Sequence, residues 1–272
     1  MATTAIQRIP EQPGSYRFGR HVEHDPRSRT FALGVLHSAA IRPVQWTRRV
    51  PIFDQKALGS CTGQAAVGLV GTDNAARTGL TEVHTPRGQF PVDEAFGVAV
   101  YGLATTLDTI PGAYPPDDSG STGLAAAKAL QQLGIASGYL HAFSVEELKS
   151  ALQVAPVMIG VVWLRSMLEP SAGGLLVVDP SSPVVGGHEL IVSGWDGARF
   201  KLDNSWGAAW GVGGSCYVSE ADMRWLLAQQ GDVTVPQFSS APAPTPSPAP
   251  AAAVTAAELA GDIRGLLTSK GV

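Results

Sequence analysis

The apolar positions of the chain change their spacing about halfway along it. From Ser60 to about Arg77, small and apolar residues recur at helical spacing and predict a helix that Gly79 closes. Gly63, Gly68 and Gly71 cost such a helix about 1 kcal/mol each relative to Ala. We therefore predict that this helix packs closely on other backbone, as a central buried helix does.

Further helices are predicted before the middle of the chain, at Val92–Asp108, Thr122–Gly134 and Ser144–Gln153. Thr122 is a suitable N-cap, and Ser144 with Glu147 forms a capping box. Ile110–Ser121 is rich in Pro, Gly and Asp and predicts a loop.

Short apolar runs then replace the helical spacing. They predict strands at Pro156–Leu164, Leu175–Asp179, His188–Trp195, Arg199–Asn204 and Ser215–Ser219. Helices first and strands second indicate an α+β protein with two lobes.

Both ends of the chain differ from this central part. Residues 1–42 form an irregular arm, in which His21 and His24 predict a solvated turn rather than a metal site, because Pro26 breaks any helix there. Residues 239–253 are a Pro/Ala linker, which we expect to be extended and semi-rigid. Residues 254–272 predict a short amphipathic helix. That helix either packs back on its own domain or serves as a site for a protein partner or for self-association.

Composition narrows the class of protein. Of 272 residues, 44% are hydrophobic and 15% are charged, as in a folded protein. The net charge of −4 provides no electrostatic footprint for nucleic acid. No stretch approaches the roughly 20 apolar residues of a membrane span. The start lacks the apolar core of a standard secretory signal, so we expect a cytoplasmic protein, or a virion- or host-associated one if it is viral.

The candidate chemistry centres on Cys61, one of two cysteines, the other being Cys216. A lone Cys is usually a small buried hydrophobe. Cys61, however, begins the first predicted helix, where the helix dipole favours a thiolate. Gly59 and Ser60 allow a sharp turn before it. Gln55, six residues upstream, is an amide donor suited to meeting an oxyanion.

Two downstream motifs extend this pattern. Gly186–Asp196 (GGHELIVSGWD) contains His188, 127 residues after Cys61, and Leu202–Gly214 (LDNSWGAAWGVGG) contains Asn204, 143 residues after it. With the Gln–Cys spacing, these motifs resemble the papain family of cysteine peptidases (clan CA) over about residues 43–238. The resemblance implies a catalytic domain there, with a helical lobe carrying the Cys helix and an antiparallel β-barrel-like lobe carrying His and Asn.

The resemblance also implies roles for single residues. Cys61 would be the nucleophile, His188 the base, Asn204 the residue that holds the imidazole and Gln55 the oxyanion donor, while Trp206 shields the Asn–His contact. The substrate would be a peptide or protein, hydrolysed through a covalent thioester, with no cofactor and no metal.

Substrate-binding residues follow from the same resemblance. Ser119, Gly120 and Ser121 match the strip that pairs with substrate backbone, and Gly187 precedes the base. Glu189 falls where the family lines its S2 pocket. An inward Glu189 would favour a basic or polar substrate side chain, whereas an outward, solvated Glu189 is the simpler expectation.

The chain also departs from the family pattern near the nucleophile. Leu58 replaces a disulfide Cys and Thr62 replaces a Trp, which resembles the bacterial and viral branches. Cys216 then has a structural role.

The hairpin between the two motifs offers a geometric test. Trp195-Asp196-Gly197 predicts its turn. A three-residue loop would set Asn204 opposite His188, on one face of the sheet, whereas a two-residue loop would set it opposite Glu189. The catalytic interpretation requires the first arrangement.

Three alternatives remain open at this stage. The protein could act as an amidase or endopeptidase on peptidoglycan stems. It could be a non-catalytic binding or assembly module with a papain-like fold. The arm of residues 1–42 could also lie over the cleft as a pro-segment and keep the enzyme latent.

Overall fold

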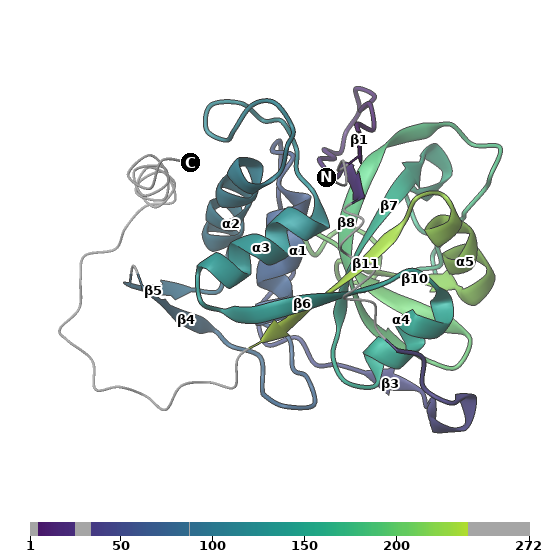
Figure 1. Cartoon of the computed structure of the whole chain (residues 1–272). Coiled ribbons are helices and arrows are strands. Elements are labelled where there is room, and N and C mark those ends of the chain that lie inside the picture. Colours follow the sequence, from purple (N-terminus) through teal and green to yellow (C-terminus); the bar gives the residue numbers. More distant parts are fainter. Residues whose placement is uncertain (1–4, 25–33, 87, 239–272) are drawn as a thin grey trace.

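Helices and strands separate into two lobes, as the order of the apolar patterns predicts (Figure 1). The structure is a computed structural model, and it describes residues 5–24, 34–86 and 88–238. The predicted linker (239–253) and terminal helix (254–272) lie outside these ranges. Every described helix is too short or too polar to span a bilayer.

The helical lobe consists of α1 (Cys61–Val70), α2 (Glu94–Leu107) and α3 (Gly123–Gln132), with a small hairpin of β4 (Glu82–Thr85) and β5 (Gly88–Pro91). Every residue of α1 is buried. A Cβ on Gly63 would lie 2.2 Å from the Gly97 carbonyl oxygen of α2. This confirms that the first predicted helix is central and packs on other backbone.

Helix α1 is shorter than the pattern predicts, because it ends at Val70 rather than near Arg77. Backbone groups from other segments bind the carbonyls at its C-terminal end. The Leu80 N–H donates to the Val70 carbonyl (3.0 Å), and the Arg49 N–H donates to the carbonyl of the C-cap residue Gly71 (2.8 Å). The chain then turns away, although the small residues that follow keep helical spacing.

The second lobe is a seven-stranded antiparallel sheet with the order β10-β9-β8-β7-β11-β6. Its strands are β6 (Ala136–Ala142), β7 (Val157–Leu164), β8 (Val184–Trp195), β9 (Arg199–Asp203), β10 (Ser215–Ser219) and β11 (Asp232–Phe238), and β3 (Val44–Gln45) pairs with β8. Helices α4 (Val145–Leu152) and α5 (Glu220–Ala228) pack beside it (Figure 1). Across the described residues this sheet is open, so the expected term barrel-like describes it only loosely.

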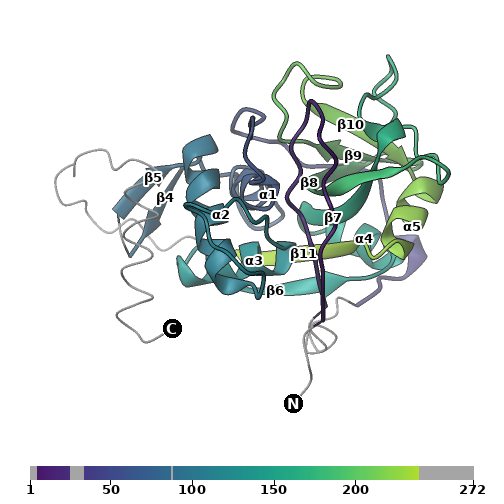
Figure 2. The ribbon, with the colours of Figure 1, turned by 90° about the horizontal axis from the view of Figure 1, so that it is seen from above.

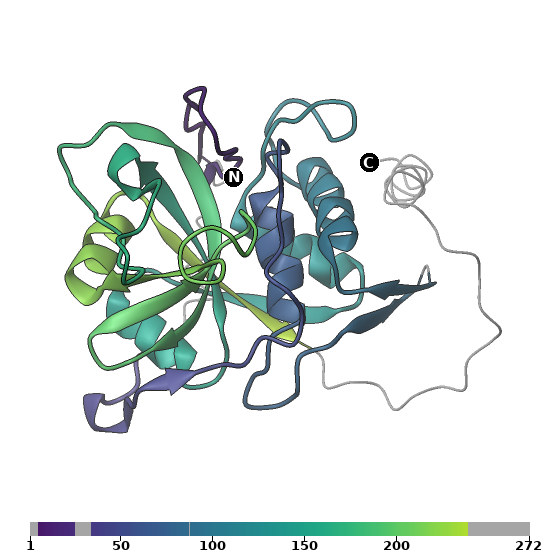
Figure 3. The same ribbon diagram turned by 180° about the vertical axis from the view of Figure 1, so that it is seen from behind.

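A hydrophobic core lies in each lobe. One includes Trp163, Leu148 and Leu226, and the other includes Leu69, Leu103 and Leu130. The segment after β3 runs behind the sheet lobe and leads into α1 (Figure 3). The beginning of α1 is therefore held at the boundary between the lobes.

Leu175–Asp179 is not a strand, contrary to the prediction. Leu175 makes only an isolated bridge to Tyr217, and Leu175 and Val177 remain 38% and 53% exposed. The short 3-10 turns Ser38–Ala40 and Arg165–Met167 complete the described elements.

Residues 5–24 of the N-terminal arm lie between the two lobes. The two ends of this segment pair as β1 (Ala5–Gln7) and β2 (Val22–His24), a short hairpin that the irregular composition does not predict. Seen from above, the arm runs between α1 and the β7–β8 part of the sheet (Figure 2). Among described residues, no group of three or more His, Cys, Asp or Glu could hold a metal ion.

Candidate active site

Cys61 is the first residue of α1, at the boundary between the lobes, and is wholly buried. Burial raises the pKa of its thiol, and backbone hydrogen bonds from Glu189 and Thr62 oppose that rise. Glu189 directly follows His188 on β8. The hydrogen bond from the Glu189 backbone N–H to Cys61 therefore places the sulfur beside the strand that carries the predicted base.

His188 and Asn204 lie side by side. Nε2 of His188 is 2.6 Å from Oδ1 of Asn204, and the Ser205 backbone N–H also donates to that oxygen (2.7 Å). Within the described part of the chain, Nδ1 of His188 has no hydrogen-bond partner. One ring nitrogen is therefore held in place and the other is free.

The register that brings them together is neither that of a two-residue loop nor that of a three-residue loop. Ile191 pairs with Asp203, so the next residue, Asn204, falls opposite Leu190. An irregularity between Val192 and Gly194 shifts the pairing by one residue. Because positions two apart share a face, Asn204 still reaches His188 on the same side of the sheet.

Aromatic rings enclose the imidazole. Trp206 stacks on His188 with centroids 4.5 Å apart, and Trp163 approaches edge-on at 5.1 Å. This burial lowers the pKa of His188 to about 4, although its hydrogen bond to Asn204 raises it. Trp206 thus lies where the predicted shield is expected.

Gln55 is fixed beside the same loop. Its Oε1 accepts from the Ser205 hydroxyl (2.7 Å), and its backbone N–H donates to the Ser205 carbonyl (2.8 Å). Its Nε2 donates to the Leu58 carbonyl (2.9 Å) and to the Arg17 carbonyl of the arm (3.3 Å). The amide therefore already contacts a peptide carbonyl lying in the cleft.

Asp118 braces the turn before Cys61, a role for which the sequence carries no signal. Both of its carboxylate oxygens accept from the Gly59 backbone N–H, at 3.1 and 3.0 Å. The Tyr101 hydroxyl donates to Asp118 (2.7 Å) and accepts from the Gly120 N–H (3.0 Å). This chain of contacts ties the turn before Cys61 to the predicted substrate strip.

The predicted substrate strip pairs with the arm. The Ser121 N–H donates to the Gly19 carbonyl (2.7 Å), and the His21 N–H donates to the Ser121 carbonyl (2.8 Å). Across the cleft, the Gly187 carbonyl accepts from the backbone N–H of Gly19 (3.2 Å) and Arg20 (2.9 Å). The His21 ring also contacts the Ser119 carbonyl at 3.0 Å. The backbone groups expected to bind substrate are thus occupied by residues 19–21.

Arm side chains also cover the imidazole. Phe18 contacts His188 edge-on with centroids 5.8 Å apart, and Tyr16 stacks on Trp206 at 4.3 Å. The Trp206 indole N–H donates to the Arg17 carbonyl (3.2 Å). The arm therefore covers His188 and Trp206.

Glu189 points inward, which overturns the expectation of a solvated side chain. It is 1% exposed, and a Cβ on Gly123 would lie 2.6 Å from its Oε1. The wholly buried Arg20 of the arm lies next to it and donates to Asp232 on β11. Burial raises the pKa of Glu189; the nearby Asp232 raises it further, whereas Arg20 lowers it.

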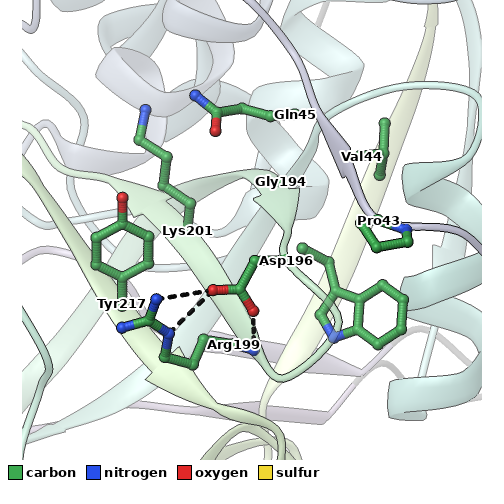
Figure 4. A pocket seen from close by; sticks show the side chains of 9 residues that line it. Pro43, Val44, Gln45, Gly194, Asp196, Arg199, Lys201 and Tyr217 are labelled. Carbon is green, nitrogen blue, oxygen red and sulfur yellow. Dashed lines mark hydrogen bonds and ion pairs between the residues drawn. The ribbon is translucent and has the colours of Figure 1, made fainter.

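A separate cavity opens beside the β8–β9 hairpin. It is lined by residues from β3, from the β8–β9 hairpin and from β10, including Trp195, Lys201 and Tyr217 (Figure 4). Asp196 there is paired with Arg199 at 2.9 Å. None of the residues predicted to act in catalysis lines this cavity, and we assign it no role in the chemistry.

A buried Cys helix set against an antiparallel sheet with a His–Asn pair is the arrangement of the papain-like cysteine peptidase fold, and this chain has that fold. Xylellain, a cysteine protease from Xylella fastidiosa, matches with a TM-score of 0.61 and 14% identity over 85% of this chain and 99% of its own. ProCathepsin B S9 from Trypanosoma congolense matches with a TM-score of 0.55 and 11% identity over 82% and 87%.

Procathepsin L 3 from the larval midgut of Tenebrio molitor gives a TM-score of 0.52 and 13% identity, over 76% of this chain and 74% of its own. No model of a known protein family matches the sequence, and no curated protein does. At these identities the likeness is one of fold.

Proposed function

We propose that the chain is a cysteine peptidase that forms a thioester on Cys61. The observation that carries this proposal is the 2.6 Å contact between Nε2 of His188 and Oδ1 of Asn204, which leaves Nδ1 free. The strand of His188 also brings the next backbone amide, that of Glu189, to the Cys61 sulfur. An oriented imidazole with one free nitrogen beside a thiol is the arrangement that activates a nucleophile.

In the proposed reaction, Nδ1 of His188 takes the Cys61 proton and the thiolate attacks the scissile carbonyl carbon. The resulting oxyanion accepts hydrogen bonds from Gln55 Nε2 and the Cys61 backbone N–H. His188 returns its proton to the leaving amine as the C–N bond breaks. Water, deprotonated by His188, then attacks the thioester, and a carboxylic acid and the free thiol are released.

In this conformation the arm covers the proposed site. Burial raises the pKa of Cys61 and lowers that of His188 to about 4, so both groups are neutral. The Arg17 carbonyl also occupies the Gln55 amide. We propose that the arm keeps the enzyme latent, and that its departure admits water and lets the thiolate–imidazolium pair form.

Labelling by an active-site-directed epoxide tests the proposal. Cys216 is the internal control, because it is a second buried free thiol whose pKa is raised by burial and the charge of Asp203. We expect mass spectrometry to find the label on Cys61 and not on Cys216, faster when the arm is displaced. We also expect Cys61→Ala to abolish peptide hydrolysis. If Cys61 stays unlabelled with the arm displaced, the fold serves binding and not catalysis.

A further inference from the structure

The arm sends one charged side chain into the interior. Arg20 is 0% exposed, whereas the side chain of Arg17, three residues earlier, is 38% exposed. Burying a guanidinium is costly unless the surrounding groups pair with it. The space that Arg20 fills is therefore built for a cation.

Gly160 on β7 creates that space. A Cβ there would lie 2.4 Å from Nε of Arg20, 2.8 Å from Oδ1 of Asp232 and 2.8 Å from Oε2 of Glu189. Any larger residue would fill the point where these three groups meet. The acidic pocket, as we call Glu189, Asp232 and Gly160 together, lies beside the Cys61 thiol, whose pKa is influenced by both Glu189 and Arg20.

The acidic pocket offers more acceptors than Arg20 uses. Arg20 donates through one terminal nitrogen to Asp232 and to the Gln230 carbonyl (2.8 Å). Within the described residues, Nε and Nη1 of Arg20 and both carboxylate oxygens of Glu189 have no partner. Buried polar atoms without partners are rare in structures. In a permanent structural ion pair these atoms of Arg20 and Glu189 would be hydrogen-bonded to each other. A pocket that binds an exchangeable ligand does not have to pair every atom of the Arg20 side chain that occupies it here.

The backbone of Arg20 is held as the backbone of a ligand would be. Ser121 pairs with the residues on both sides of it, and the Gly187 carbonyl accepts its N–H. Both were predicted to bind substrate. Main-chain pairing in the cleft and a side chain in the adjacent pocket are together the way in which extended peptides are recognised.

We propose that the acidic pocket selects an arginine side chain in the peptide substrate, and that Arg20 occupies the pocket as an internal stand-in. This inference rests on the proposed peptidase function. When the arm leaves, Glu189 and Asp232 remain close together without a cation, which favours an incoming guanidinium. Arginine suits the site better than lysine, because its planar group directs several donors at once toward the carboxylates and the Gln230 carbonyl.

The test uses the full-length chain with two substitutions: Arg20→Ala, which empties the pocket, and Gly19→Ala, whose Cβ would lie 2.0 Å from the Gly59 carbonyl oxygen and so displaces the arm. Two fluorogenic peptides differ only in the residue before the one whose carbonyl is attacked, which is arginine in one and its neutral isostere citrulline in the other. We expect kcat/KM to favour arginine at least tenfold, and Glu189→Gln or Asp232→Asn to bring the ratio toward one. Glu82→Gln, an exposed acid on β4, is the matched control and should leave the ratio unchanged.

A second measurement does not depend on catalysis. In the chain with Arg20→Ala and Cys61→Ala, N-acetyl-arginine methylamide should raise the melting temperature, and the citrulline analogue should not. If the melting temperature rises in this way but no peptide is cleaved and Cys61 is never labelled, the proposed peptidase function is wrong and the proposed arginine pocket is still supported. Cleavage of both peptides at equal rates, or a preference that survives both carboxyl substitutions, would overturn the inference.

Discussion

The approach of Gly19 to Gly59 allows the covering arm to be tested with one methyl group. A Cβ on Gly19 would lie 2.0 Å from the Gly59 carbonyl oxygen and 2.6 Å from its carbon. Gly59 has little freedom to move, because the Asp118 carboxylate holds its N–H. Overpacking of this kind destabilises the covered conformation by about 1–3 kcal/mol. The equilibrium constant for release of the arm then rises about 5- to 150-fold. Gly19→Ala should therefore release the arm.

The assay is the rate at which a thiol reagent labels Cys61 in the full-length chain, with trypsin cleavage after Arg17 as an independent report of arm release. Gly14→Ala is the control in the same arm, because its Cβ would meet only the Gln12 carbonyl oxygen at 3.9 Å. We expect the rates of Cys61 labelling and of trypsin cleavage to rise about 5- to 150-fold in Gly19→Ala and to stay unchanged in Gly14→Ala. Equal rates in wild type and both variants would refute the reasoning.

Further predictions concern the site itself. In the arm-released chain, Gln55→Ala should lower kcat about 10²- to 10³-fold, because it removes an oxyanion donor; an unchanged kcat would remove Gln55 from that role. Gly187→Ala should speed Cys61 labelling by a small reagent without permitting peptide hydrolysis, because its Cβ would lie 2.1 Å from the Arg20 carbonyl oxygen, where substrate backbone must also pass. The free energy of unfolding should fall as pH drops from 6.5 through 4. The His188 pKa is about 4 in the folded protein, so the unfolded chain takes up the proton first. The loss reaches roughly 3 kcal/mol, and comparison with His188→Gln in denaturant titrations isolates it, because burial also lowers the pKa of His21 in both proteins. A pH profile identical in the two would contradict the assignment.

The residues of the proposed site could be selected from the sequence because each belongs to a local pattern. Gln55 and Cys61 are six residues apart at a helix start. The first downstream motif spans most of β8, and the second begins at the end of the neighbouring strand β9. The pairing between His188 and Asn204 was predicted on the right face but in the wrong register. The irregularity at Ser193 depends on how β3 and β9 both meet β8, which no short pattern records.

Other features depend on distant segments and could not be predicted. The inward position of Glu189 follows from Arg20 and Asp232, which lie 169 residues before it and 43 residues after it. The sequence pattern does not predict β11, and Pro236 within it is unfavourable inside a sheet. The strand accommodates it because its pairing with β7 ends at Thr234, and Pro236 pairs only with Tyr139 of β6.

Because the arm that closes the cleft is part of the same chain, its occupancy does not depend on protein concentration. A tethered segment experiences an effective concentration on the order of 1 mM. Contacts that would give a free peptide a dissociation constant of only about 10 µM then keep about 99% of molecules closed. One backbone cut between the arm and β3 would convert this into an ordinary bimolecular equilibrium. At nanomolar enzyme the severed arm would dissociate and be lost to dilution, so activation by cleavage would be irreversible without any change in the contacts themselves.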